Sequence, residues 1–64
     1  MGMSKPTKSK ELYDLTAELR HETHNAYLLD DGTKKAWVPK ALVEDNGDGT
    51  WTMPQWLAED KEFV

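Results

Sequence analysis

The stretch Asn25-Ala-Tyr-Leu-Leu-Asp-Asp-Gly-Thr-Lys-Lys-Ala-Trp-Val-Pro-Lys-Ala-Leu-Val43 sets the organisation of this chain of 64 residues. It predicts a β-hairpin with one strand over residues 26–29 and the other over residues 34–38. Asp31-Gly32 forms the turn, because Gly adopts positive φ and Asp tolerates the left-handed region. Pro39 ends the second strand since it has no N–H to donate, and residues 40–43 form one helical turn or bend.

Before the hairpin, residues 12–20 alternate between apolar and polar side chains. Tyr13, Leu15, Ala17 and Leu19 fall on one side, and the residues between them are polar. This period of two is typical of a half-buried strand. A helix over residues 10–20 stays possible, because Glu, Leu and Ala favour helix and the leucines also have helical spacing.

After the hairpin, residues 45–49 read Asp-Asn-Gly-Asp-Gly and predict a second turn. A short strand follows over residues 50–53. Pro54 suits the first turn of a helix that runs to about Glu62, with Thr52 as its N-cap. Such a short helix requires docking, and Trp56 is the expected anchor.

The sequence therefore predicts an α+β fold in which a small antiparallel β-sheet of three to four strands carries one packed C-terminal helix. Residues 1–10 are predicted to be a flexible tail and residues 11–64 a single small domain, which buries only a modest core. The predicted core residues are Leu15, Leu19, Leu28, Trp37, Val38, Leu42, Trp51, Trp56 and Leu57.

The net charge of −4 conceals an uneven distribution. Residues 1–10 contain three lysines, whereas residues 11–64 carry twelve carboxylates against five basic side chains, a net charge of −7. This disfavours direct nucleic-acid binding, which requires cations to displace phosphate counterions, and favours a basic partner. The alternative is that the acidity only keeps a small domain soluble. The chain has no cysteine, no long apolar run and no signal-peptide core, so we expect a cytosolic protein without a membrane partner.

Motifs for metal binding and catalysis are weak. His21 and His24 are three apart, one short of the zincin spacing. Residues 21–25 are expected to form a polar turn, and no third ligand is suggested nearby. Residues 44–55 resemble half of a calcium loop, but Gln55 stands where such loops place a bidentate Glu. No nucleophile elbow, phosphate loop or buried carboxylate pair is present. We therefore expect no enzyme, no cofactor and no metal.

The remaining candidate site is the acidic surface. Carboxylates spread over a compact domain can occupy a protein groove built for phosphates, since duplex DNA carries one negative charge about every 1.7 Å of its axis. This is the DNA-mimic hypothesis. The predicted partner-binding residues are Asp30, Asp31, Glu44, Asp45, Asp48, Glu59 and Asp60.

Two segments carry a family resemblance: Lys35-Ala-Trp-Val-Pro-Lys40 and Asp48-Gly-Thr-Trp-Thr-Met-Pro-Gln-Trp-Leu-Ala-Glu59. Together they resemble small proteins of phages and mobile elements that share a Trp-Val/Ile-Pro-Lys segment and a closing Pro-x-Trp-Leu-Ala-Glu helix. Within that type the chain is similar to the small acidic anti-CRISPR proteins that inhibit the type I-C system of Pseudomonas. The resemblance covers residues 26–64.

The resemblance implies an antiparallel sheet flanked by helix and stoichiometric inhibition of the type I-C Cascade complex in the cytoplasm of the host bacterium. A monomer would block target DNA binding at the basic DNA-binding surface of a Cas8-type subunit. The first alternative is an accessory phage protein that acts as a protein–protein interaction module through the exposed hairpin. The second is a small nucleic-acid binder that stacks bases on Trp37 and Trp51, which the net acidity disfavours.

Overall fold

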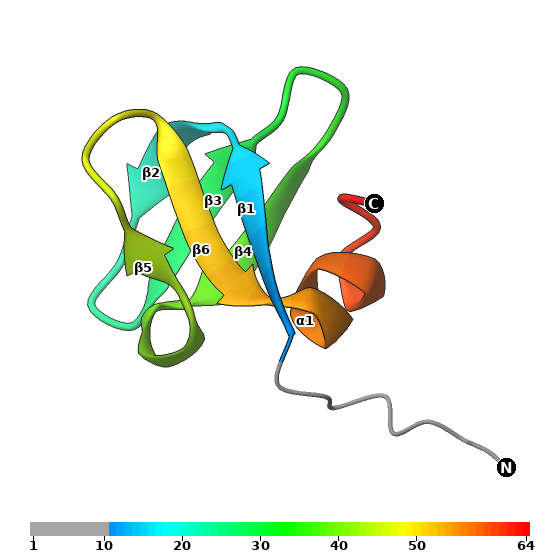
Figure 1. Cartoon of the computed structure of the whole chain (residues 1–64). Helices are drawn as coiled ribbons and strands as arrows, with labels where there is room; N and C mark the ends of the chain where they lie inside the picture. The colour runs from blue at the N-terminus through cyan, green and yellow to red at the C-terminus, as the bar shows by residue number, and fades with distance from the viewer. Residues whose placement is uncertain (1–10) are drawn as a thin grey trace, which may run out of the picture.

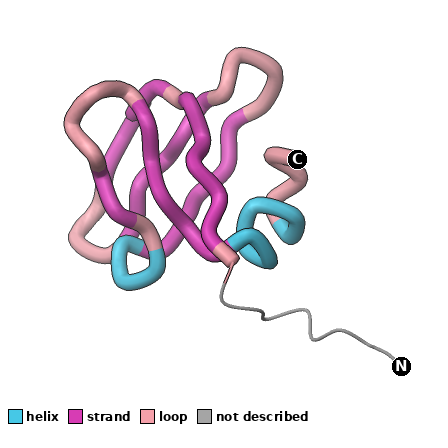
Figure 2. Tube along the Cα trace, viewed as in Figure 1, coloured by secondary structure: helices cyan, strands magenta, loops and turns pink. Residues whose placement is uncertain are grey.

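The computed structural model describes residues 11–64, which form two three-stranded antiparallel sheets and a short C-terminal helix (Figure 1). Sheet A has the strand order β1-β6-β5, and sheet B has the order β2-β3-β4. Figure 2 shows that the two sheets form two layers of strand, with both helical segments at one end. The elements are β1 (Leu12–Thr16), β2 (Glu18–Glu22), β3 (Ala26–Asp30), β4 (Lys35–Pro39), η1 (Lys40–Leu42), β5 (Glu44–Asp45), β6 (Thr50–Pro54) and α1 (Gln55–Asp60).

The antiparallel pairing and the C-terminal helix agree with the prediction, but the strand count does not. A single sheet of three to four strands was expected, and the structure has two sheets. The difference arises at residues 12–20, which are extended, as the alternation predicted, but form two strands rather than one. Ala17 separates β1 from β2, so the same stretch of chain passes from sheet A into sheet B.

The corner at Ala17 is fixed by hydrogen bonds to the β5–β6 hairpin. The Ala17 N–H donates to the carbonyl oxygen of Gly49 at 3.1 Å. The Ala17 carbonyl accepts a bond from the indole Nε1 of Trp51 at 3.0 Å. Ala17 lies between two strands, and its N–H and its carbonyl both have hydrogen-bond partners outside the regular strand pairing. Backbone polar groups that are shielded from water need such partners. Corners of this kind are how strands change sheets.

The β2 strand contains a second irregularity. Leu19 pairs with Leu29, but the next paired residue is His21, opposite Leu28, so Arg20 is the extra residue of a β-bulge. Because a bulge inserts one residue, the side chains after it point to the opposite face of the sheet from the one that regular alternation would give. His21 is thus placed on the outer face of sheet B.

The predicted hairpin is present as β3–β4, with Gly32 at φ 96° in its turn. Its register pairs Leu28 with Trp37 and Leu29 with Ala36. Adjacent residues face opposite sides of a sheet, and Leu29 is the one that is fully buried. Leu28 and Trp37 consequently face outward. Their prediction as core residues was wrong: Leu28 is half-buried and Trp37 is 42% exposed.

The core lies between the sheets and beneath the helix. Four of the predicted core residues are buried, namely Leu15, Val38, Trp51 and Leu57, whereas Leu19 and Leu42 are exposed and Trp56 is only partly buried. The buried residues are Leu15, Leu29, Val38, Val43, Trp51, Met53, Leu57, Ala58 and Phe63.

The C-terminal helix differs from its prediction at both ends. Pro54 occupies the N-cap position without a side-chain cap, and Thr52 lies within β6. The Gln55 N–H donates instead to the Glu11 carbonyl at 2.9 Å, which satisfies one of the free N–H groups of the first turn. The helix ends at Asp60.

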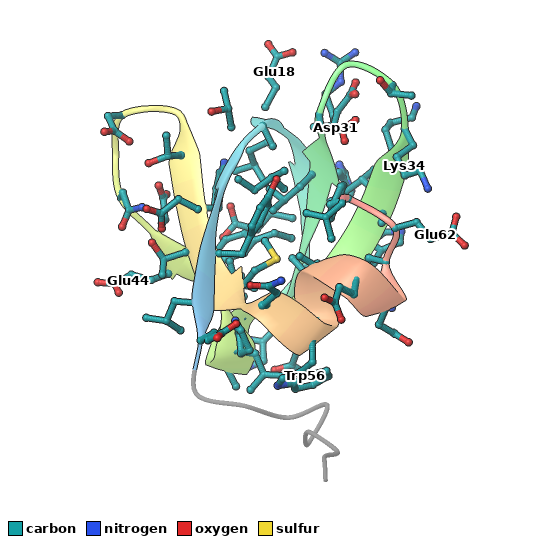
Figure 3. The ribbon with its side chains drawn as sticks, turned by 45° about the vertical axis from the view of Figure 1, so that its right-hand side comes forward. Glu18, Asp31, Lys34, Glu44, Trp56 and Glu62 are labelled. Carbon is teal, nitrogen blue, oxygen red and sulfur yellow. The ribbon has the colours of Figure 1, made fainter. Side chains whose placement is uncertain are left out.

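The helix docks through a different anchor from the one predicted. Leu57 and Ala58 are its buried residues, and Phe63 joins them in the core. The predicted anchor, Trp56, is partly buried and packs against this cluster (Figure 3).

The predicted tail, residues 1–10, lies outside the described part of the chain. Within the described part, none of the helices has the length and apolar character needed to cross a membrane.

We expect Trp51→Phe to destabilise the fold, because it removes the donor to the Ala17 carbonyl as well as part of a buried ring. The Ala17 carbonyl is only part-buried, so its loss of a partner should cost about 1 kcal/mol, the lower end of the range for a buried group, and the lost packing adds to this. Urea denaturation followed by circular dichroism measures the change.

The matched control is Trp37→Phe, which makes the same substitution at an exposed position and should shift stability by less than about 0.5 kcal/mol. Equal losses for the two variants would refute the role assigned to Trp51.

Candidate functional site: an acidic sheet face

The seven predicted binding carboxylates fall into three groups that belong to different elements. Asp30 and Asp31 lie at the β3–β4 turn of sheet B. Glu44, Asp45 and Asp48 lie on β5 and the turn after it, in sheet A. Glu59 and Asp60 end the helix. The structure thus brings the second group together on one sheet and leaves the other two groups on separate elements.

The carboxylates at the β3–β4 turn shape that turn. Asp30 Oδ1 accepts the Gly32 N–H at 2.8 Å. Asp31 Oδ1 accepts the N–H groups of Lys34 at 2.9 Å and of Thr33 at 2.8 Å. The bond from the Lys34 N–H, followed by that from Thr33, lowers the pKa of Asp31, because both stabilise the ionised form.

Basic side chains balance the charge of sheet B. Residues 17–43 contain four carboxylates and four lysine or arginine side chains, a net charge of zero. Arg20 Nη1 lies 3.0 Å from Glu18 Oε1, and its Nε lies 3.7 Å from Asp30. Lys40 Nζ lies 2.6 Å from Glu22 Oε2. The neighbourhood of Asp30 and Asp31 is therefore close to electroneutral.

Lys34 extends this neutralisation to the C-terminal segment. Its Nζ lies 2.9 Å from Glu62 Oε1, and the two side chains approach each other in Figure 3. The hydrogen bond from Lys34 lowers the pKa of Glu62. Of the predicted helix carboxylates, Glu59 accepts a bond from Gln55 Nε2 at 3.2 Å, and Asp60 is exposed at the helix end.

Sheet A, unlike sheet B, carries a strong net negative charge. The residues that build it and its turn, 11–16 and 44–54, contain five carboxylates and neither lysine nor arginine, a net charge of −5. This is most of the net charge of −7 carried by residues 11–64. The carboxylates are Glu11, Asp14, Glu44, Asp45 and Asp48.

Two of these carboxylates are held by the β5–β6 turn. Asp45 Oδ1 accepts the Gly47 N–H at 2.9 Å. Asp48 Oδ1 accepts the Thr50 hydroxyl at 2.6 Å and the Thr50 N–H at 3.0 Å. The hydroxyl bond is the main reason that the pKa of Asp48 lies below its ordinary value.

A chain of side-chain hydrogen bonds runs from this turn across the outer face of sheet A. Asn46 Nδ2 donates to the hydroxyls of Thr50 at 3.1 Å and Thr52 at 2.9 Å. The Thr52 hydroxyl donates in turn to Asp14 Oδ1 at 2.7 Å. Asp14 and Asp48 are therefore joined through one network, and their carboxylates have fixed positions.

Asp14 was not among the predicted binding residues, although it lies on the same face of sheet A as Glu44. Its outward direction followed from the alternation over residues 12–20, but its neighbours could not be known before the β1–β6 register, which pairs it with Thr52. Glu44 also pairs with Thr52, from the other side. We call the outward-facing surface around Asp14, Glu44 and Asp48 the acidic face. Asp45 pairs with the buried Trp51 and is exposed beside this face, at the edge of sheet A.

Glu44 is the carboxylate of the acidic face that is most available to a partner. It is exposed and projects away from the edge of sheet A in Figure 3. Within residues 11–64 its side chain forms no hydrogen bond or ion pair, and its backbone belongs to the β5–β6 ladder. A cation can therefore bind it without displacing an existing contact.

The histidines and tryptophans take other positions. His21 lies in β2, not in a turn as predicted, and contacts the ring of Trp37 edge-on at 6.0 Å between centroids. In the described part of the chain, no cluster of three or more His, Cys, Asp or Glu side chains is placed to bind a metal ion. Trp51 is buried, so it cannot serve as the stacking surface considered in the nucleic-acid alternative.

Comparison of the chain with protein-family models, with curated proteins and with solved structures finds no match in any of the three.

We expect Thr50→Ala to raise the pKa of Asp48 toward its ordinary value of 3.8, because the hydroxyl that stabilises the carboxylate is lost. The pKa of Asp31, in the other turn, should stay low. Carboxyl ¹³C NMR titration measures both groups in one sample, and Asp31 serves as the internal control. An unchanged Asp48 would contradict the assigned cause.

The same depressed pKa values determine how stability depends on pH. A carboxyl whose folded-state pKa lies below its unfolded value stabilises the fold fully above the unfolded pKa. That contribution is lost as pH falls below 3.8 through the lower folded-state values of Asp31 and Asp48. Thr50→Ala should reduce the loss attributable to Asp48.

Proposed function

We propose that this chain is a phage-type anti-CRISPR protein that prevents target DNA binding by the type I-C Cascade complex. In this proposal its acidic face occupies a basic, DNA-binding surface of the complex, on the Cas8-type subunit. The protein acts stoichiometrically as a monomer in the cytoplasm of the host bacterium, without catalysis. The sequence resemblance supports the choice of partner, and the charge distribution supports the mode of binding.

The segregation of charge is the observation that carries the proposal. Sheet A has a net charge of −5 with no basic side chain, whereas residues 17–43 have a net charge of zero. Acidity that served solubility alone would not need to be concentrated in one of the two sheets. A one-sided field orients the molecule as it approaches a positively charged surface and raises the association rate.

The hydrogen bonds on the acidic face favour mimicry of a rigid anion. Asp14 and Asp48 on this face, and Asp45 beside it, already accept hydrogen bonds from neighbouring hydroxyl or backbone N–H groups. Binding therefore requires little further ordering of these side chains, which reduces the entropy lost on association. Each carboxylate has a second oxygen with which to accept a bond from lysine or arginine.

The predicted binding residues differ in the contribution expected of them. Glu44, Asp45 and Asp48, joined by Asp14, form the main contact. Asp30 and Asp31 are partly neutralised by neighbouring bases. Glu59 and Asp60 extend the negative potential from the helix.

A second candidate function is supported by the outer face of sheet B. There Trp37 is 42% exposed beside His21 and Leu28, on a surface without net charge. Exposed aromatic side chains on a rigid scaffold are typical anchors of protein–protein contacts. This feature fits an accessory phage protein that binds another phage protein through the hairpin.

The anti-CRISPR proposal predicts different results for two sets of variants in a gel-shift assay with purified type I-C Cascade and target duplex. Asp14→Asn/Glu44→Gln should weaken inhibition by about tenfold, because it removes two charges from the acidic face while keeping side-chain size. Glu18→Gln/Glu22→Gln removes the same total charge from sheet B and should change inhibition by no more than about twofold.

Inhibition should also weaken steeply as salt rises, since exposed charges are screened. Undiminished DNA binding by Cascade in excess of this protein would refute the anti-CRISPR proposal. The accessory-protein candidate gains support instead if a pull-down recovers a phage protein and no Cas subunit, and if Trp37→Ser abolishes that recovery.

A further inference from the structure

An apolar groove of about 370 Å³ lies beside the acidic face. Its floor is the outer side of sheet A, where Leu12 of β1 pairs with Pro54 of β6. Its wall is η1 and the residues that lead into β5. The lining residues are Leu12, Ala41, Leu42, Val43, Glu44, Thr52, Met53 and Pro54.

Large apolar side chains are exposed in this groove. Leu12 is 66% exposed and Leu42 is 39% exposed. Leu12 occupies an outward-facing position of β1, where Asp14 and Thr16 are polar. Contiguous exposed apolar surface that is rimmed by polar groups is typical of interaction sites and ligand-binding grooves.

The charges next to the groove indicate the kind of partner. Glu44 belongs to the groove wall, and Asp14 is the next outward-facing residue of β1 after Leu12. The elements of sheet A supply no lysine or arginine to offset them. A partner must therefore combine an apolar side chain with adjacent positive charge. A second copy of the chain or a nucleic acid would bring further negative charge to this face.

We propose that the groove receives an aliphatic or aromatic side chain from a basic protein segment whose lysines or arginines pair with Asp14 and Glu44. This inference rests on the proposed function, in which the partner is the basic surface of Cascade. It adds that the carboxylates and the groove contribute to the same interface through different interactions. The carboxylates supply attraction that salt screens, and the groove supplies affinity that salt does not screen.

The test uses a closely matched pair of variants of the full chain. Leu42→Ser alters the groove, and Leu19→Ser alters sheet B, where Leu19 is 38% exposed compared with 39% for Leu42. Circular dichroism checks that both fold. Affinity for purified type I-C Cascade is measured at about 0.1 M and about 1 M salt, between which the Debye length falls from about 10 Å to about 3 Å.

We expect Leu42→Ser to weaken binding by about tenfold at both salt concentrations, and Leu19→Ser to leave it unchanged. Asp14→Asn/Glu44→Gln should weaken binding at low salt only. Equal effects of Leu42→Ser and Leu19→Ser would overturn the inference.

A peptide experiment separates this inference from the proposed function. The probes are two labelled peptides with arginines on both sides of a central residue, which is leucine in one and glycine in the other. If the groove binds an apolar side chain, the leucine peptide will bind the unmodified chain more tightly than the glycine peptide does. This preference will disappear in the Leu42→Ser variant. Equal binding of the two peptides overturns the groove proposal. Failure to bind Cascade together with a leucine preference overturns only the assignment of Cascade as partner.

Discussion

The hydrogen bonds at Ala17 are the constraint on which the rest of the fold depends. The chain leaves sheet A and enters sheet B at this single residue, and its N–H and carbonyl are both bonded to the β5–β6 hairpin. The indole of Trp51 is at once a core side chain and the donor to that carbonyl. The corner therefore ties the start of sheet B to the β5–β6 hairpin of sheet A through a residue of the core.

The corner also separates two surfaces of different chemistry. Sheet A presents fixed carboxylates and an apolar groove, and sheet B presents Trp37 among balanced charges. In so small a domain the same strands must supply both the core and the outer faces, because alternate residues point in opposite directions. The register of each strand therefore decides both which side chains enter the core and which form the outer face. A slip of one residue in the register of a strand would move its buried side chains to the outer face and its exposed ones to the core.

Local structure could be predicted from the sequence where turn chemistry specifies it. The Asp31-Gly32 turn, the helical turn after Pro39 and the strand before Pro54 agree with the structure. Burial could not be predicted as well, because it depends on long-range register. Leu28 and Leu29 are adjacent and both apolar, and only the pairing with β4 decides which one is buried.

The two-sheet architecture was missed for a similar reason. The alternation over residues 12–20 does not show where one strand stops pairing with β6 and starts pairing with β3. For the candidate site, the sequence shows the cluster of carboxylates in residues 44–48. It does not show which residues from other strands lie beside them on the surface. Asp14 joins that surface only through a hydrogen bond to Thr52 from a distant strand. The groove brings together Leu12, Leu42 and Pro54 in the same way.

The pairing of β1 with β6 has a consequence for the order of folding. Sheet B is a meander of neighbouring strands, whereas sheet A joins Leu12 to Pro54 across nearly the whole described chain. Closing so long a loop costs more entropy than forming a hairpin, so sheet B should form first and sheet A last. The acidic face would then be the last surface to appear and the first to be lost in partial unfolding. Faster native-state amide exchange in β1 and β6 than in β3 would reveal this order, and the reverse would exclude it.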